Sequence, residues 1–253
     1  MRFLRLFSAL LFSGLLVISP SLYAEVVYVA VASNFTDAMK DIAKQYEAES
    51  GNKVALTFGS SGKFVAQIQH GAPFQVFLSA DQNKPDALEK AELVVPNSRF
   101  TYAIGALALW SAKADFIHNN EDRLKNGDFN KVALANPKLA PYGVAAMEVL
   151  EGLGLTTATQ PKWVMGENIS QTYQFVSTVN ADLGFVALSQ IMSQGQIKSG
   201  SSWIIPADQY SPIRQDAVLL KSAASSAAAR DLLDYLRSDK ARRIIHSYGY
   251  KME

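Results

Sequence analysis

A short segment rich in glycine and serine, GSSGK at residues 59–63, separates an apolar stretch from an amphipathic one. A Walker-type phosphate loop needs two glycines separated by four residues, followed by Lys and then Ser or Thr. Here two residues separate Gly59 from Gly62, and Phe64 follows Lys63, so that pattern is absent. A nucleophilic serine elbow needs G-x-S-x-G, which is one residue longer than GSSG. A turn that binds an anion through hydroxyl and amide groups fits these residues better.

Three other segments also place small, hydroxyl or amide residues where a strand or loop gives way to a predicted helix. They are Ser33-Asn34, Pro141-Tyr142-Gly143 and Asn168-Ile169-Ser170. Each segment alone is typical of a helix cap. In open parallel sheets, however, the carboxyl ends of strands and the amino ends of the following helices line one crevice. Four such helix starts, two from each of two lobes, would surround a small anion with N–H groups, hydroxyls and positive dipole ends.

Outside these turns the sequence offers no local pattern for metal binding or catalysis. The three histidines, His70, His118 and His246, are far apart and lack metal-binding spacing, so we interpret them as surface or capping residues. Asp37 takes the position of a capping carboxylate in the first turn of its helix. Lys63 is the one cation in the four turns, and we interpret it as pointing to solvent. We expect no catalytic residue, no metal-binding residue and no cofactor.

The elements that must position these turns alternate along the chain. Strands are predicted at residues 26–32, 53–58 and 74–80, with amphipathic helices between them, which indicates an open parallel sheet with helices on both faces. The apolar stretch 98–112 is long enough for one strand that passes from one lobe into another. A second α/β series follows it, then a turn-rich segment at 206–220 and terminal helices. The sequence therefore predicts an α/β protein with two lobes, the first of them completed by the C-terminal segment.

The first 24 residues have the layout of a secretory signal peptide. Arg2 and Arg5 precede an uncharged apolar run, and the small residue Ala24 follows at the expected cleavage site. Removing the two arginines leaves 22 basic against 23 acidic residues, a balance that argues against nucleic acid or an anionic membrane as a partner. The chain has no cysteine, and a lipid anchor would require one. We expect a periplasmic protein that is not anchored to the membrane.

Several segments together resemble the molybdate-binding periplasmic proteins of ABC importers. The resemblance covers nearly all of the mature chain, and it is carried by VAVASNFTDAMKDIAKQYE, FGSSGKFVAQIQHGAPFQVFLSAD, SRFTYAIGALALWSAK, NPKLAPYGVAAMEVL and ADLGFVALSQI. The ordered combination of GSSG, G-A-P-x-x-V-x-x-S-A-D and APYG is much more specific than any one of these pieces.

The resemblance implies a type II periplasmic binding fold. Such a fold has two α/β lobes, each a mixed, mainly parallel sheet flanked by helices, joined by two crossover strands. For this chain it implies a first lobe of residues 25–104 plus 212–253 and a second lobe of residues 105–211. The lobes would close over one tetrahedral oxyanion.

The same resemblance implies which residues hold the ligand. Matched motif by motif, the donors are Ser33, Asn34, Ser61, Tyr142 and the backbone amide of Ile169. Some family members place a ligand tyrosine after LGIV, where this chain has Ala187, so the tyrosine from APYG takes that role here. The implied function is a non-catalytic, monomeric receptor for molybdate or tungstate that delivers its ligand to an ABC transporter permease.

Two other functions stay open at the level of sequence. A receptor for sulfate or another oxyanion would use the same donors, because these anions share charge and shape. The four turns offer mainly donors, which suits a fully deprotonated oxyanion. A periplasmic serine hydrolase would use Ser61 as nucleophile and would need a nearby base. His70 lies at the far end of the same short helix and is poorly placed for that role.

Overall fold

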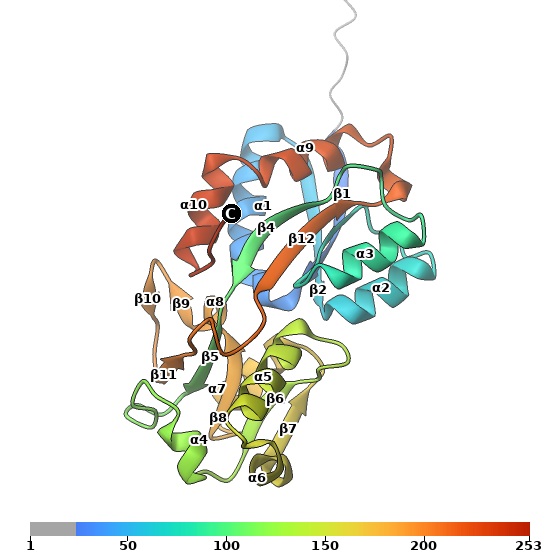
Figure 1. Ribbon diagram of the computed structural model, residues 1–253. Helices are drawn as coiled ribbons and strands as arrows, with labels where there is room; N and C mark the ends of the chain where they lie inside the picture. The colour runs from blue at the N-terminus through green and yellow to red at the C-terminus, as the bar shows by residue number, and fades with distance from the viewer. Residues whose placement is uncertain (1–23) are drawn as a thin grey trace, which may run out of the picture.

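The computed structural model describes residues 24–253, which form two lobes, one above the other in Figure 1. The predicted signal peptide therefore lies outside the described residues, apart from its last residue. The upper lobe, lobe I, is built on a five-stranded sheet in the order β2-β1-β3-β12-β4. Its strands are β1 (Val26–Ala32), β2 (Lys53–Gly59), β3 (Val76–Leu78), β4 (Phe100–Gly105) and β12 (Ile213–Leu219).

The lower lobe, lobe II, is built on a second five-stranded sheet in the order β11-β5-β8-β6-β7. Its strands are β5 (Leu107–Ser111), β6 (Val132–Ala135), β7 (Trp163–Gly166), β8 (Leu183–Ala187) and β11 (Ser201–Ile204). A small antiparallel hairpin, β9 (Met192–Ser193) and β10 (Gln196–Ile197), occurs along the chain between β8 and β11.

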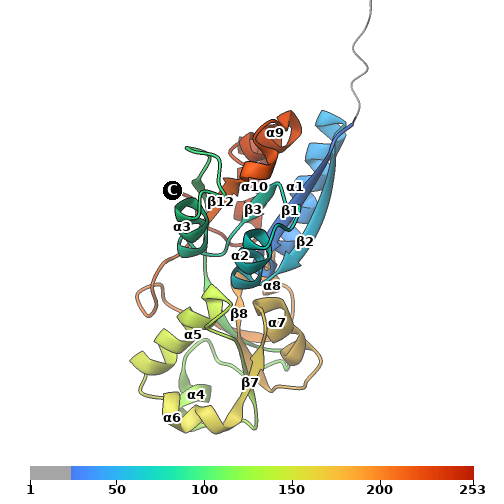
Figure 2. The ribbon, with the colours of Figure 1, turned by 90° about the vertical axis from the view of Figure 1, so that its right-hand side faces the viewer.

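Helices cover both faces of each sheet. In lobe I, α1 (Thr36–Ser50), α9 (Ala227–Tyr235) and α10 (Asp239–Ser247) pack on one face, and α2 (Ser61–Gln69) and α3 (Asn83–Lys90) pack on the other. In lobe II, α5 (Pro141–Gly152) and α7 (Ile169–Ser177) lie on opposite sides of the sheet (Figure 2). The shorter elements are η1 (Ser33–Phe35), α4 (Asp122–Asn126), α6 (Thr156–Thr159), η2 (Gln160–Lys162), α8 (Leu188–Ile191) and η3 (Lys221–Ala223).

Local sequence explains α1, the longest helix among the described residues. Ala38, Met39, Ile42, Ala43 and Tyr46 recur at helical spacing and are buried, so one face of the helix enters the core. The helix ends at Gly51, whose backbone adopts a left-handed conformation with φ of 75°. Glycine reaches this conformation without a Cβ clash, so it is a natural stop signal.

Both sheets are mixed, as predicted, and in each sheet parallel and antiparallel pairings are equally frequent. β1 pairs in parallel with β2 and β3, whereas β12 runs antiparallel to both β3 and β4. In the second sheet β6 pairs in parallel with β7 and β8, and β5 runs antiparallel to β8 and β11. The predicted α/β fold class with two lobes is confirmed.

Two sequence predictions need correction. The stretch 98–112 is two strands instead of one, because β4 ends at Gly105 in the first sheet and β5 begins at Leu107 in the second. The second half of the stretch 206–220, predicted to be turn-rich, is β12, which returns the chain to lobe I. Its charged and polar residues concealed a strand that is almost wholly buried, since Asp216 is paired with Arg99 at 2.5 Å and does not face water.

Within residues 24–253, no helix combines the length and the apolar character that a membrane crossing requires. The residue boundaries of the two lobes remain a prediction, although the changes of sheet after β4 and before β12 are consistent with them.

Candidate functional site

Four helix starts meet at one small cavity between the lobes. η1 with α1, and α2, bring their amino ends from lobe I, and α5 and α7 bring theirs from lobe II. The cavity volume is about 10 Å³, which is enough for roughly one water molecule. Its lining consists of Ala32, Ser33, Asn34, Gly59, Ser60, Ser61, Ala80, Ala140, Pro141, Tyr142, Asn168 and Ile169.

All five residues predicted as ligand donors line this cavity. The fold thus brings together positions that are up to 136 residues apart in the sequence. No lining residue carries a charged side chain, so the positive potential at the cavity comes from N–H groups and helix dipoles. That these residues contact an anion stays a prediction.

The capping interpretation can be tested at each helix start. The side chain of Asn168 accepts a hydrogen bond from the Gln171 N–H at 3.0 Å and so caps α7. The starts of η1, α1, α2 and α5 have no side-chain cap. Within residues 24–253, moreover, the backbone N–H groups of Ser61, Tyr142 and Ile169 have no protein acceptor. These groups are available to a ligand.

Ser61 is fixed by its neighbours. Its Oγ accepts a hydrogen bond from the Ala80 N–H at 2.9 Å, and the residue is buried. Because the hydroxyl already accepts from Ala80, it keeps its own proton for donation. The arrangement suits a donor better than a nucleophile, since no histidine, lysine or carboxylate lines the cavity to act as a base.

The Tyr142 hydroxyl is oriented by Gln215, a residue on β12 that sequence reasoning missed. The Gln215 Nε2 donates to the Tyr142 hydroxyl at 3.2 Å, so the tyrosine proton must point elsewhere. The Gln215 Oε1 accepts from the Asn34 Nδ2 at 2.8 Å and from the Tyr102 hydroxyl at 3.0 Å. Gln215 is completely buried, and these partners satisfy both ends of its amide.

The same bonds define what Asn34 can offer. Its Nδ2 donates to Gln215 and also to the Tyr250 hydroxyl at 2.9 Å, so both side-chain N–H groups are occupied. Its donor toward the cavity is therefore the backbone N–H. Gln215 and Tyr250 carry no sequence motif that marks them, and the polar residues around Gln215 indicated a turn-rich segment instead of a strand.

The tyrosines around this network keep their protons. Burial raises the pKa of Tyr142 and of Tyr102 well above the ordinary value, and it also raises the pKa of Tyr250. Desolvation is the main cause in all three, because a buried phenolate would lose its hydration. Each hydroxyl is consequently a donor throughout the neutral and moderately alkaline range.

Direct hydrogen bonds join the lobes around the cavity. The Ser170 hydroxyl donates to the Ser33 carbonyl at 3.0 Å, and the Ser189 hydroxyl donates to the Asn34 carbonyl at 2.8 Å. On the other side, the Gly62 N–H donates to the Leu139 carbonyl at 3.0 Å. A Cβ at residue 62 would meet that carbonyl oxygen at 3.0 Å, so glycine permits the close approach. The structure is that of closed lobes.

Two charged residues differ from their sequence interpretation. Lys63 forms an ion pair with Glu167 of the opposite lobe, although half of its side chain is exposed, so it does not simply point to solvent. Asp37 lies in the first turn of α1 but makes no cap, and its carboxylate lies 3.6 Å from Lys198 of lobe II. Both residues take part in contacts between the lobes that no single helix could reveal.

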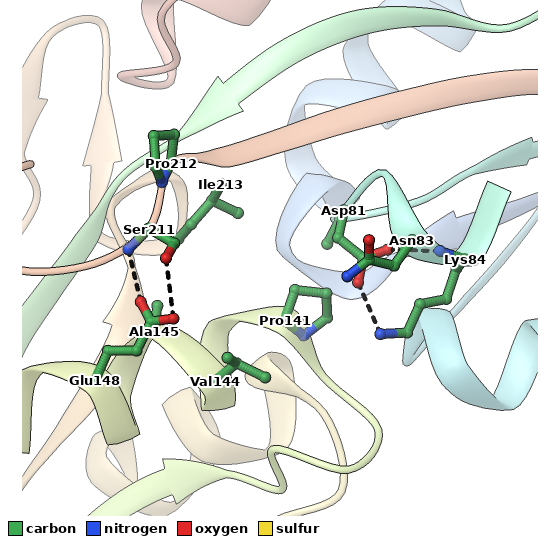
Figure 3. Close-up of a pocket in the computed structure, with 11 residues that line it drawn as sticks. Asp81, Asn83, Lys84, Pro141, Val144, Ala145, Glu148, Ser211, Pro212 and Ile213 are labelled. Atoms are coloured by element: carbon green, nitrogen blue, oxygen red, sulfur yellow. Dashed lines mark hydrogen bonds and ion pairs between the residues drawn. The ribbon is translucent and has the colours of Figure 1, made fainter. Parts of the chain in front are cut away.

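A larger neighbouring cavity of about 250 Å³ shares Ala80 and Pro141 with the small one (Figure 3). Carboxylates reach it from both lobes: Glu148 accepts from the Ser211 N–H at 2.6 Å, and Asp81 pairs with Lys84 at 2.7 Å. A dianion would be repelled by Glu148 at this place. The small neutral cavity therefore fits an oxyanion better, despite its size.

Comparison with known proteins identifies the family. The model of a family described as bacterial extracellular solute-binding protein matches residues 27–251. The chain belongs to this family. It is 52% identical over 227 residues to the molybdate-binding protein ModA of Azotobacter vinelandii, with 90% of each chain covered. It is 47% identical to the protein of the same name from Rhodobacter capsulatus, with 92% of this chain and 91% of the relative covered.

A solved structure agrees with these family members. The periplasmic molybdate-binding protein of Azotobacter vinelandii matches with a TM-score of 0.87 and 40% identity, covering 90% of this chain and 99% of that chain. The family resemblance drawn from the sequence motifs is confirmed. Within the part of the chain that the structure describes, no cluster of three or more His, Cys, Asp or Glu side chains could hold a metal ion.

Proposed function

We propose that this chain is a periplasmic receptor that binds molybdate or tungstate between its two lobes and delivers it to an ABC transporter permease. Two curated relatives that cover most of the chain, at 52% and 47% identity, are named for molybdate binding. The observation in the structure that carries the proposal is the neutral, donor-lined cavity at four helix starts. A fully deprotonated oxyanion needs donors on every side, which this cavity supplies.

The proposed ligand donors are those predicted from the sequence, assigned now by atom. The hydroxyl of Ser61 and that of Tyr142 each have a proton to donate, because each already accepts a bond from a protein group. Backbone N–H groups at the helix starts complete the site, including that of Ile169. Ser33 and Asn34 donate from the start of η1. One chain supplies all of these groups, so we propose that the receptor works as a monomer.

The proposed mechanism is closure around the ligand. The open form captures the oxyanion, and the lobes then close by bending at the two crossovers, 105–107 and 205–212. Closure completes the donor set because each lobe holds part of it: Ser33, Asn34 and Ser61 belong to lobe I, and Tyr142 and Ile169 belong to lobe II. The ligand shifts the equilibrium to the closed form by binding that form more tightly, and the closed form docks on the permease. We also propose export through the signal peptide 1–24 and lobe boundaries at 104/105 and 211/212.

Two other functions could draw on the same cavity. A sulfate receptor would use the same kinds of donor, and it differs in the size of cavity that the closed lobes leave. A serine hydrolase acting through Ser61 would need a base, and the lining residues include no histidine, lysine or carboxylate. We therefore propose that the protein is not an enzyme.

Isothermal titration calorimetry on purified, ligand-stripped protein tests the function directly. We expect tight binding of molybdate and tungstate, and weaker binding of sulfate and phosphate in the same buffer. No heat with molybdate together with tight binding of sulfate would replace the proposal by the first alternative. Hydrolysis of phosphate or acyl esters that disappears in Ser61→Ala would replace it by the second.

A further inference from the structure

One buried hydroxyl at the cavity has no partner. Among residues 24–253, three buried side-chain polar atoms lack a hydrogen bond: the Oγ of Ser60, the Oγ1 of Thr156 and the Oε1 of Gln209. Of these three residues, Ser60 alone lines the cavity between the lobes. Ser60 is 3% exposed, so its hydroxyl does not form a hydrogen bond with water at the protein surface. A buried polar atom without a partner is costly and calls for an explanation.

We infer that the Ser60 hydroxyl donates a further hydrogen bond to the bound oxyanion, in addition to the five residues predicted from the sequence. This inference rests on the proposed function. The oxyanion provides the acceptor that the protein does not, and the cost of burying the hydroxyl is then offset when the ligand is bound.

The helix-cap explanation for Ser60 is not supported. The residue occupies the N-cap position of α2 with φ of −80° and ψ of 141°, a conformation in which serine ordinarily accepts a hydrogen bond from the second or third helical N–H. Here the side chain makes no such bond. The position has the right residue type and backbone for a cap, yet the hydroxyl is left free for another partner.

Ser60 and Ser61 thus have different roles in one turn. The Ser61 Oγ is held by the Ala80 N–H at 2.9 Å, so its position is set by the protein before any ligand arrives. No hydrogen bond holds the Ser60 Oγ, and its hydroxyl can turn to meet an oxyanion oxygen. The pair combines one fixed donor with one adjustable donor, on adjacent residues at the start of α2.

The test measures affinity and ligand-free stability in the same variants. In Ser60→Ala we expect molybdate to bind about 10- to 100-fold more weakly by calorimetry, because a hydrogen bond to a charged group is lost. We expect the melting temperature of the ligand-free protein to stay the same or to rise, since the hydroxyl has no protein partner to lose. Weaker binding without a loss of ligand-free stability distinguishes a ligand donor from a structural residue.

Two further variants keep the test decisive. Ser60→Gly also lacks the hydroxyl, and glycine is tolerated at an N-cap, so it serves if the alanine variant folds poorly. Thr156→Val removes a buried unpartnered hydroxyl far from the cavity, and we expect it to leave molybdate affinity unchanged. Wild-type protein that binds molybdate, with folded Ser60 variants that bind it within twofold of wild type, would overturn the inference alone. Wild-type protein that fails to bind molybdate would overturn the proposed function.

Discussion

The two lobes have the same sheet architecture but supply different chemistry. The order β2-β1-β3-β12-β4 in lobe I corresponds to β7-β6-β8-β5-β11 in lobe II, and in each sheet one strand, β12 or β5, opposes the other four. The helices that reach the cavity follow corresponding strands as well, β1 and β2 in one lobe and β6 and β7 in the other. Equivalent topology therefore places two helix starts on each side of the cavity.

The side chains at these starts differ. Lobe I brings serine hydroxyls, and the Oγ of Ser61 is positioned by Ala80 within the same lobe. Lobe II brings the Tyr142 hydroxyl, which is oriented by Gln215 from lobe I. The Ser61 hydroxyl is thus positioned within its own lobe, whereas the Tyr142 hydroxyl is oriented by a residue of the opposite lobe. The comparison teaches that equivalent helix starts can carry donors that depend on the opposite lobe to different degrees.

Gln215→Glu should produce the largest effect, because it reverses the hydrogen bond that orients Tyr142 and adds a negative charge. A glutamate at this position would accept from the Tyr142 hydroxyl and turn its proton away from the cavity. We expect molybdate affinity to fall at least about 100-fold, roughly 3 kcal/mol. Gln215→Met is the matched control without charge, and its loss should be smaller. Calorimetry that gave equal affinities for wild type and Gln215→Glu would contradict this role.

Tyr142→Phe isolates the contribution of the tyrosine hydroxyl that lobe II supplies. We expect a loss of about 1.5–3 kcal/mol in binding free energy, because a hydrogen bond to a charged ligand is removed. Tyr210→Phe is the matched control: its hydroxyl accepts from the Leu107 N–H at 3.0 Å at the crossover and does not line the cavity. That control should lower the melting temperature without weakening molybdate binding. Equal affinities for the two phenylalanine variants would remove Tyr142 from the site.

The ion pair between Lys63 and Glu167 tests whether surface charge helps to hold the lobes together. Both side chains are about half exposed, 50% and 45%, so the pair should contribute no more than about 1 kcal/mol. We expect Lys63→Met to speed molybdate dissociation by about two- to fivefold in low salt, with the difference shrinking as ionic strength rises.

The control for this ion pair lies within lobe I. Lys53→Met breaks the pair of Lys53 with Glu47, which does not bridge the lobes, and should leave dissociation unchanged. Stopped-flow measurement of molybdate release distinguishes the two variants. A loss of affinity in Lys63→Met that persisted unchanged at high salt would indicate direct contact with the ligand in place of a bridge between lobes.

The smallest expected effect is that of pH on binding. Burial raises the pKa of Tyr142, Tyr102 and Tyr250, so these donors stay protonated and affinity should be flat between about pH 7 and pH 9.5. The unfolded chain loses its tyrosine protons near the ordinary pKa of about 10, whereas the folded chain keeps them. Stability from this source is therefore complete below that pH and is lost as pH rises further. A tyrosine-dependent drop in binding below pH 9 would contradict the buried network.

Much of the architecture could be predicted from the sequence because it depends on local pattern. Apolar strands, amphipathic helices and the glycine that ends α1 are encoded within short segments, and the four helix starts were found in the same way. The β12 strand was missed because Arg214, Gln215 and Asp216 interrupt its apolar run. Gln215 and Asp216 are buried through partners more than a hundred residues away, among them Asn34 and Arg99.

The sequence by itself determined the four donor-rich turns, the residues matched to the ligand donors, and the absence of a Walker loop. Tertiary structure alone decided how those residues are used. It showed Lys63 paired with Glu167 across the lobes, Ser61 fixed by Ala80, and Ser60 without a partner. It also placed Gln215 against Tyr142. The physical reason is that residue type and spacing limit what a side chain can donate, whereas its actual partner depends on long-range packing that no local pattern records.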